Sequence, residues 1–216
     1  PNVGSYVVDA NGVVTFTPLA SFTGTAPSLS YQVQDSLGQY GSSTYTPTVL
    51  APADPTAAPD TTKATSGTAQ SINPISNDTV GATGVTFTAS TVKLCATGQT
   101  SPNCTANTLV IPGQGTYTVN GTTGVITFTP CAGVNTPAGA SCTGPFAGSA
   151  TAATYQVSTN TGQTASSTYT PTVIAPPSPT ADSATAGWDV NQTFTPTTND
   201  TAGIGTTLNA VPLGIC

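Results

Sequence analysis

The amino-acid sequence predicts an all-β protein built from tandem β-sandwich repeats of about 124 residues. The first observation is an eleven-residue phrase, SSTYTPTVLAP, which begins at Ser42 and returns with one substitution at Ser166, 124 positions later. The second is composition, because Thr, Val, Tyr and Phe recur whereas Glu, Arg and Met are absent, and this favours strands over helices. The third is a set of short runs in which apolar residues alternate with Thr, the pattern of a half-buried strand.

The chain has few charged residues and a negative net charge, which limits the classes of molecule that it can bind. Charged residues make up 5% of the 216 positions, and the net charge is −6. The basic side chains are Lys63 and Lys93, so the chain cannot neutralise a row of phosphates and we expect no nucleic-acid binding. No apolar run approaches the roughly 18 residues of a membrane-spanning helix, so we expect no membrane insertion.

A hairpin is predicted at the start of the chain, and a second copy of it further on. The pair Asn11-Gly12 separates two β-rich stretches, which is the usual signal for a tight turn. Four apolar side chains would share its core face: Tyr6, Val8, Val14 and Phe16. The pattern returns from 115 to 130, with a longer turn that opens at Asn120-Gly121. The core face of this copy would hold Tyr117, Val119, Ile126 and Phe128.

Another hairpin and the repeated phrase complete the back half of each repeat. Tyr31 and Val33 alternate before the phrase, as their counterparts do 124 positions later. Within the phrase, Pro47 and its counterpart Pro171 lack a backbone donor. This predicts a strand at the edge of a sheet or at a bulge.

Proline-rich segments follow each phrase, and we interpret them as linkers between repeats. They run from Ala51 to Asp60 and from Ala175 to Asp182, and proline favours an extended, semi-stiff chain. The strand-like runs that follow the first linker are Val85–Thr88, Thr91–Cys95 and Thr108–Ile111. About seven or eight short strands in a repeat of this length are typical of an immunoglobulin-like sandwich, although their order cannot be read from the sequence.

These boundaries divide the chain into three parts that are out of phase with the repeat. Residues 1–54 would be the C-terminal half of a repeat, residues 55–178 one complete repeat with an N-terminal linker, and residues 179–216 the N-terminal half of the next repeat. We expect each half to leave an open half core unless a neighbouring copy completes it.

Short motifs recur in the back half of each repeat: Gly-x-Tyr-x-Val, Gly-Val-x-Thr-Phe-Thr-Pro, Phe-x-Gly, Tyr-x-Val and Tyr-Thr-Pro-Thr-Val. The first copy carries them on Gly4, Tyr6, Val8, Gly12, Val13, Thr15–Pro18, Phe22, Gly24, Tyr31, Val33 and Tyr45–Val49. This half resembles the CshA-type fibril repeat of bacterial surface fibrillar adhesins. The resemblance implies repeats that stack end to end as an extracellular stalk, with host binding mainly in a separate N-terminal region. The chain departs from that pattern in its cysteines and in an insertion of about 12 residues after Pro130.

The cysteines predict two local disulfides. Cys95 and Cys104 bracket one loop, and Cys131 and Cys142 bracket the insertion. Each bridge would close roughly ten residues and contribute about 2–3 kcal/mol in the loop-entropy model. Crossed pairing stays open, because four cysteines allow three connectivities, and so do free buried thiols. Structural disulfides indicate an oxidising, extracellular setting. The fifth cysteine, Cys216, corresponds to Cys95, and we expect its partner beyond the end of this sequence.

Residues for catalysis or metal binding are sparse, so we expect no enzyme activity, no cofactor and no metal site. Without His, the chain can form neither a Ser-His-Asp nor a Cys-His arrangement, and a zinc site is poorly supported. Asp78 and Asp200 recur in equivalent Asn-Asp-Thr segments and are the candidates for calcium. Calcium needs six to eight oxygen ligands, so an Asx-turn or capping role is the preferred interpretation.

The sequence therefore predicts a structural segment of a secreted, cell-surface fibre or stalk that provides length and stiffness. Its expected partners are neighbouring copies of the same repeat, in the same chain or in the same fibre. The alternative is an adhesive or carbohydrate-binding module that uses loop tips such as the insertion at 131–142 and binds a host protein or glycan.

Overall fold

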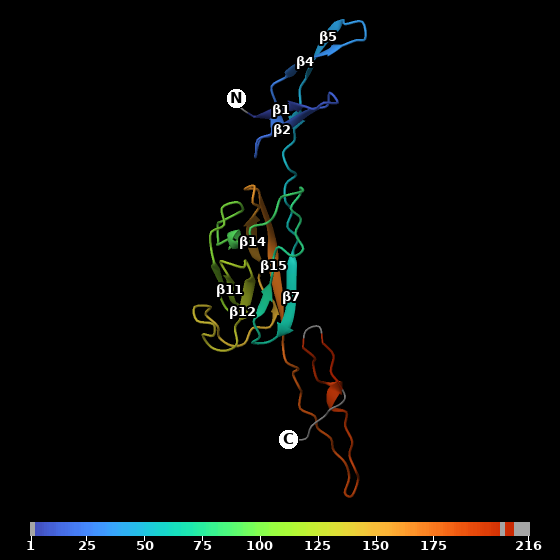
Figure 1. The fold of residues 1–216 in the computed structure, drawn as a ribbon. Coiled ribbons are helices and arrows are strands. Elements are labelled where there is room, and N and C mark those ends of the chain that lie inside the picture. The colour runs from blue at the N-terminus through green and yellow to red at the C-terminus, as the bar shows by residue number, and fades with distance from the viewer. Residues whose placement is uncertain (1–2, 204–205, 210–216) are drawn as a thin grey trace. The chain divides into compact units, whose positions relative to one another are not determined.

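The computed structural model describes residues 3–203 and 206–209, and the chain divides into two compact units, Pro1–Ala53 and Asp54–Cys216 (Figure 1). Within the described residues the regular structure consists of strands and two 3-10 helices, η1 (Ala89–Thr91) and η2 (Pro196–Thr198), which confirms the all-β class. Neither helix comes near the length that a membrane crossing requires. The further boundary that the sequence suggests near residue 178 stays a prediction.

Unit 2, Asp54–Cys216, contains a β-sandwich of two sheets. One sheet has the strand order β10-β11-β12-β8, and the other has the order β13-β15-β14-β9 with β7 added beside β15. Neighbouring strands are antiparallel, except that β7 and β15 run parallel. The strands are β7 (Asp60–Thr65), β8 (Gln70–Ile72), β9 (Lys93–Leu94), β10 (Thr108–Ile111), β11 (Gly115–Val119), β12 (Ile126–Pro130), β13 (Gly148–Ser149), β14 (Ala153–Ser158) and β15 (Thr164–Ile174).

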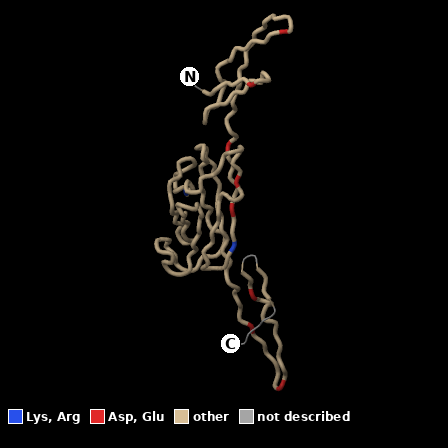
Figure 2. The backbone as a smooth tube through the Cα atoms, in the orientation of Figure 1, with Lys and Arg blue, Asp and Glu red and all other residues tan. Residues whose placement is uncertain are grey.

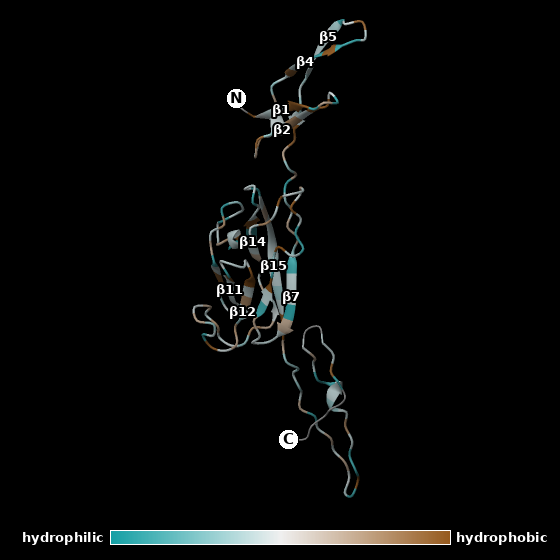
Figure 3. Cartoon of the chain, in the orientation of Figure 1, coloured by the Kyte–Doolittle hydropathy of each residue, from teal (hydrophilic) through white to brown (hydrophobic). Residues whose placement is uncertain are grey.

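Alternating apolar residues from both sheets meet in one core, as the sequence pattern predicts. In the hairpin of β11 and β12, Tyr117 lies opposite Phe128, and both side chains are fully buried. Figure 3 shows that β11 and β12 carry more apolar residues than β7. The facing sheet contributes Leu94, Ala153, Tyr155, Val157, Tyr169 and Val173 to the same core.

The strand that contains the repeated phrase lies inside its sheet and not at an edge. β15 has β14 and then β13 on one side and β7 on the other. Pro171 is fully buried, and its carbonyl accepts a hydrogen bond from the N–H of Ala150 at 2.9 Å. Its missing donor falls where the partner strand changes from β14 to β13, so the sheet tolerates proline there. The predicted edge position is therefore wrong for this proline.

β7 is a strand that the sequence pattern does not predict, because it begins at the end of the presumed linker. The residues before it also belong to the sandwich, since Pro55 is buried and Ala57 packs against the core. The linker predicted from Ala51 to Asp60 is therefore too long. The predicted strand Val85–Thr88 contributes only one isolated bridge, at Phe87.

Unit 1, Pro1–Ala53, repeats the back half of the sandwich. Tyr6 lies opposite Phe16, as the predicted hairpin requires. Ala26 is the one buried residue among the described residues of this unit, so the unit has no closed core. Its strand pairs are β1 (Gly4–Val8) with β2 (Val14–Pro18), β3 (Gly24–Thr25) with β6 (Thr48–Val49), and β4 (Leu29–Gln34) with β5 (Tyr40–Tyr45).

Candidate functional site

Hydrogen bonds join residues 56–58, at the start of the sandwich, to residues 78–79. The Oδ1 atom of Asp78 accepts a hydrogen bond from the backbone N–H of Ala58 at 2.9 Å. Beside this bond, Thr56 and Thr79 exchange two backbone hydrogen bonds of 2.8 and 2.9 Å. Together these bonds hold the chain that leads into β7 against the Asn-Asp-Thr segment. We call this arrangement the aspartate clamp.

The aspartate clamp recurs near the C-terminus. The Oδ1 atom of Asp200 accepts a hydrogen bond from the N–H of Thr180 at 2.7 Å. Ser178 and Thr201 exchange backbone hydrogen bonds of 2.9 and 3.1 Å beside it. Each of these residues lies 122 positions after its counterpart in the first clamp, so the clamp is a repeated element.

The clamp corrects the role predicted for the two Asn-Asp-Thr segments. Asp78 and Asp200 each bind a backbone N–H that lies 20 residues earlier, so they do not act within their own turn as an Asx-turn would require. Figure 2 shows how widely the acidic residues are spaced along the chain. Across residues 3–203 and 206–209, no group of three or more acidic, His or Cys side chains is placed to hold a metal ion.

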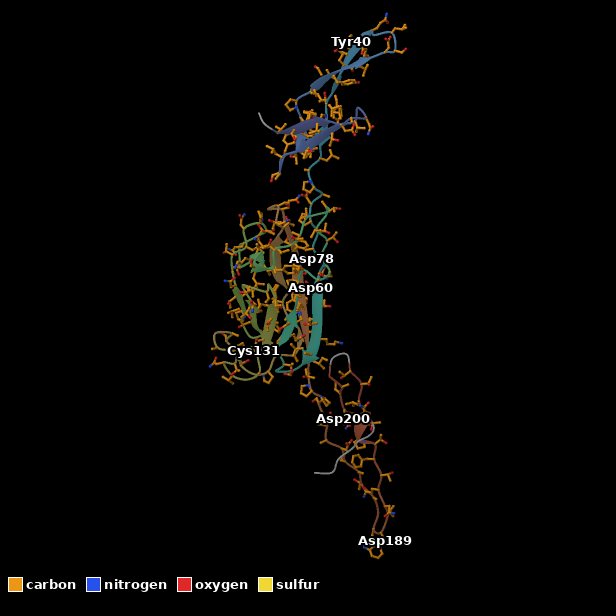
Figure 4. The ribbon with its side chains drawn as sticks, viewed as in Figure 1. Tyr40, Asp60, Asp78, Cys131, Asp189 and Asp200 are labelled. Carbon is orange, nitrogen blue, oxygen red and sulfur yellow. A yellow bond between two sulfur atoms is a disulfide. The ribbon has the colours of Figure 1, made fainter. Side chains whose placement is uncertain are left out.

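A buried tyrosine and a buried aspartate lie next to the first clamp. The hydroxyl of Tyr155, on β14, donates to Oδ2 of Asp60 at 2.9 Å, and it also lies 3.2 Å from the carbonyl oxygen of Pro74. Tyr155 is completely buried and Asp60 is 8% exposed. Figure 4 shows Asp60 and Asp78 close together in the sandwich. A substrate in solution cannot reach this pair, so its properties are those of a structural bond between β7 and β14.

Burial controls the proton affinity of this cluster. Burial raises the pKa of Asp60, although hydrogen bonds from Tyr155 and Asn77 oppose the rise. Burial also raises the pKa of Asp78, and the nearby Asp60 carboxylate adds to that rise. The Oδ2 atom of Asp78 is buried without a hydrogen-bond partner, which fits a carboxyl group that binds a proton readily.

Asp60 and Tyr155 were not identified as a pair by the sequence motifs. A signal for Asp60 is nevertheless present, because it recurs as Asp182 at the same offset of 122 that relates the two clamps. Tyr155 is predicted only as a core residue, since the alternation pattern does not reveal where its hydroxyl lies. Alignment of the sequence from Asp60 with the sequence from Asp182 reveals that the aspartate recurs. It does not reveal that Tyr155 is its hydrogen-bond partner.

The first disulfide closes the loop between β9 and β10. Cys95 and Cys104 are bonded, with 4.3 Å between their Cα atoms. The N–H of Cys104 donates to Oε1 of Gln156 at 2.8 Å, which ties the closed loop to β14. The four described cysteines therefore pair as neighbours and not in a crossed pattern.

The second disulfide anchors the insertion, and Figure 4 shows its Cys131 apart from Asp60 and Asp78. Cys131 and Cys142 are bonded, and with Ala140 they form a small buried cluster against which Phe146 packs. Within the loop, Val134 is 69% exposed. The fifth cysteine, Cys216, lies outside the described residues.

Unit 1 exposes the face that unit 2 buries. Tyr31 is 40% exposed and Val33 is 61% exposed, whereas their counterparts Tyr155 and Val157 are completely buried. An open groove of about 660 Å³ lies over this face and is lined by residues of β1, β2, β4 and β5 together with Gly12. Within residues 3–49, this face of unit 1 is therefore largely exposed.

The aromatic residues of this face are already arranged as in the closed sandwich. The rings of Tyr6 and Phe16 lie 4.8 Å apart at 42°, and Tyr6 meets Tyr45 edge-on at 6.3 Å. In unit 2 the corresponding distances are 4.7 and 5.7 Å, with the same tilted and edge-on arrangements. The counterparts in unit 2 are Tyr117, Phe128 and Tyr169.

Among the described residues after β15, three large apolar side chains are exposed. Phe194 is 63% exposed, whereas its counterpart Ile72 packs against the core of unit 2. Trp188 is 96% exposed and Val190 is 60% exposed. The segment keeps its clamp, and its assignment to the front half of a next repeat stays a prediction.

Comparison with known proteins connects these features to a family. A family described as the surface adhesin CshA repetitive domain matches residues 1–49 and 52–173. A search of curated proteins finds no significant match. Among solved structures, the chain is similar to a crystal structure of the N-terminal eight Ig domains of Down Syndrome Cell Adhesion Molecule isoform 1.30.30. That similarity has a TM-score of 0.30 and 10% sequence identity, and it covers 82% of this chain and 21% of the length of the other.

Proposed function

The chain belongs to the family of the surface adhesin CshA repetitive domain, and from this premise we propose that it is a structural, non-catalytic segment of an extracellular cell-surface fibre or stalk. In this proposal its partners are neighbouring copies of the same repeat. The two disulfides support an extracellular location, because they form and persist in oxidising surroundings.

The observation that carries the proposal is the parallel pairing of β7 with β15. Asp60, where β7 begins, lies opposite Tyr169, and Thr65, where it ends, lies opposite Ile174. Figure 1 shows the two strands side by side. The chain therefore enters the sandwich at one end of this pair and leaves at the other, so successive repeats would extend the polymer rather than fold back on it.

The connection between repeats is short. β15 ends at Ile174, and the second clamp begins at Ser178, so three residues separate them. Two of the three are prolines, which restrict the backbone. A short and restricted connection supports a stalk whose length grows in regular steps.

Small-angle X-ray scattering on chains with one, two and three complete repeats would test this function. β15 has 11 residues, which corresponds to a strand of roughly 36 Å. We expect the maximum dimension to grow by at least about that length with each added repeat. A maximum dimension that stays constant from two repeats to three would contradict the proposal.

A second candidate function, adhesion through the insertion, is favoured by one observation. The disulfide from Cys131 to Cys142 closes the loop, and Val134 within it is 69% exposed. If the loop binds a host protein or glycan, Val134→Asp should abolish binding on protein and glycan arrays. Val13→Asp is the matched control, because Val13 is a comparably exposed valine, at 57%, in the turn of unit 1.

A further inference from the structure

We propose that Asn120 is a self-modification site, at which the side-chain amide is converted to a carboxylate after attack by the backbone nitrogen of Gly121. The site lies in the turn between β11 and β12, and it goes beyond the proposed function. Spontaneous conversion of this kind is fastest where glycine follows asparagine, because glycine has no side chain to shield its backbone nitrogen. The sequence contains two such pairs, Asn11-Gly12 and Asn120-Gly121.

The turn holds the amide oxygen of Asn120 between two backbone donors. Its Oδ1 atom accepts hydrogen bonds from the N–H groups of Thr122 and Thr123, each at 3.0 Å. These donors draw electrons from the amide carbon Cγ and would stabilise the negative charge that the oxygen acquires when a nucleophile adds there. The arrangement is that of an oxyanion hole, in which fixed N–H groups at about 3 Å lower the barrier to acyl transfer.

Further hydrogen bonds fix the turn around this oxygen. The N–H of Gly124 donates to the backbone carbonyl of Asn120 at 2.8 Å, and the N–H of Asn120 donates to the carbonyl of Val125 at 2.9 Å. Both ends of the turn are therefore held, and the two donors with them. Folding has thus already oriented the reacting groups, which is the main entropic requirement of an intramolecular reaction.

The attacking nitrogen is accessible and has no acceptor of its own. Asn120 and Gly121 are both exposed. Among residues 3–203 and 206–209, none accepts a hydrogen bond from the N–H of Gly121. A Cβ atom added to Gly121 would meet no atom within 4 Å, so there is room for water to take the proton and for a ring to close.

The reaction needs water and no other reactant. The nitrogen of Gly121 loses its proton to water and bonds to Cγ of Asn120, the bond from Cγ to Nδ2 breaks, and ammonia leaves with the proton. Water then opens the five-membered imide. Opening at Cγ gives aspartate, whereas opening at the backbone carbonyl gives isoaspartate, in which the main chain runs through the former side chain.

The turn can accommodate the aspartate product. A carboxylate at position 120 still offers an oxygen to the N–H groups of Thr122 and Thr123, and its charge strengthens both hydrogen bonds. The isoaspartate product instead lengthens the main chain between β11 and β12 by a methylene group. The state of Asn120 would therefore record the time that has passed since the chain folded.

The other pair, Asn11-Gly12, has the opposite hydrogen bonds. The N–H of Gly12 donates to the carbonyl of Asp9 at 3.1 Å, so the attacking nitrogen is engaged. No residue in the described part of the chain donates a hydrogen bond to the side-chain oxygen of Asn11. Two identical dipeptides are thus distinguished by their hydrogen bonds, and these favour reaction at Asn120.

The test incubates the full 216-residue chain at neutral pH in water enriched in heavy oxygen, which labels each converted residue. Peptide mapping by mass spectrometry measures conversion at each asparagine, and an isoaspartate-specific methyltransferase detects the second product. In the folded chain, conversion at Asn120 should be at least about 10-fold faster than at Asn11, a smaller factor than one oxyanion-hole donor contributes in an enzyme. In urea, with the disulfides intact, the two sites should react at similar rates.

Two variants separate the reaction from the fold. Gly121→Ala leaves the donors to Asn120 in place but puts a methyl group beside the attacking nitrogen, so conversion should slow by about 10-fold. Asn120→Ser keeps a side-chain oxygen for the same donors but has no amide, so the signal from this peptide should disappear. Thermal unfolding checks that each variant keeps the fold of unit 2.

Two outcomes would overturn the proposal. One is conversion at Asn120 that is no faster in the folded chain than in urea. The other is a folded chain in which Asn11 reacts faster than Asn120. Neither result bears on the proposed stalk function, because the scattering test of that function does not involve this turn.

Discussion

The hydroxyl of Tyr155 donates a hydrogen bond of 2.9 Å to the carboxylate of Asp60, and this bond joins the front half of the sandwich to its back half. Tyr155 lies on β14, whereas Asp60 is the first residue of β7. The bond therefore forms only when both halves of a repeat are present.

Removal of the hydroxyl in Tyr155→Phe should destabilise unit 2 by about 1–3 kcal/mol, because the buried Asp60 carboxylate loses its donor. Chemical denaturation followed by circular dichroism would measure the change. Tyr31→Phe is the matched control at low protein concentration, since Tyr31 is the exposed counterpart in unit 1. Equal losses for the two variants would show that the bond to Asp60 is not the cause.

Acid should stabilise unit 2. Burial raises the pKa of Asp60 and of Asp78 above the ordinary value of 3.8, so both carboxyl groups bind protons more tightly in the folded chain. The stability that they contribute is complete below 3.8 and is lost as the pH rises through their folded pKa values. The thermal midpoint of unit 2 should therefore rise as the pH falls from 7 towards 3.8.

The double variant Asp60→Asn, Asp78→Asn is the control for this pH dependence. Asparagine keeps the shape and an acceptor oxygen but does not titrate, so the rise on acidification should be much smaller. A rise of equal size in the variant would assign the effect to other acidic groups.

Loss of the disulfide in Cys95→Ser, Cys104→Ser should cost about 2–3 kcal/mol in the loop-entropy model, because the loop between β9 and β10 would then be free in the unfolded chain. Peptide mapping without reduction would check the pairing itself. A peptide that links Cys95 to Cys131 or Cys142 would contradict the neighbour pairing.

Gly115→Ala should destabilise unit 2 by about 1–3 kcal/mol or more. Gly115 has a φ of +153°, and a Cβ atom there would collide with the carbonyl oxygen of Thr129 and lie 2.9 Å from the ring of Phe128. Gly121→Ala is the matched control, because no atom lies within 4 Å of the added methyl group and its φ is not in the left-handed region. Thermal unfolding of the two variants would separate the steric effect from the general effect of replacing glycine.

The back half of each repeat could be predicted from the sequence because its signal is local. Alternation of Tyr117 and Phe128 with Thr, and a turn at Asn120-Gly121, fix the hairpin and its core face without knowledge of distant residues. The same reasoning places Tyr155 and Val157 in the core, where the structure has them.

The front half could not be predicted because its contacts connect distant residues. β7 has the sequence DTTKAT, with no apolar alternation, and it becomes a strand because β15, more than 100 residues later, offers it an unpaired edge. Asp78 looks like a local turn residue, but its partner Ala58 lies 20 residues earlier. The likeness of Asp60 to Asp182 was visible, but only the fold shows that this carboxylate faces Tyr155.

The parallel pair of β7 and β15 has a mechanical consequence. A pulling force on a stalk would reach the sandwich at the start of β7 and leave it at the end of β15, so it would act along the two strands in opposite directions. The hydrogen bonds of the six paired positions from Asp60–Tyr169 to Thr65–Ile174 would then be loaded in shear, and they would have to fail together. In an antiparallel hairpin pulled from its open end, the bonds would instead break one after another. The tensile strength of each repeat would therefore reside in its first and last strands, without any covalent bond between them.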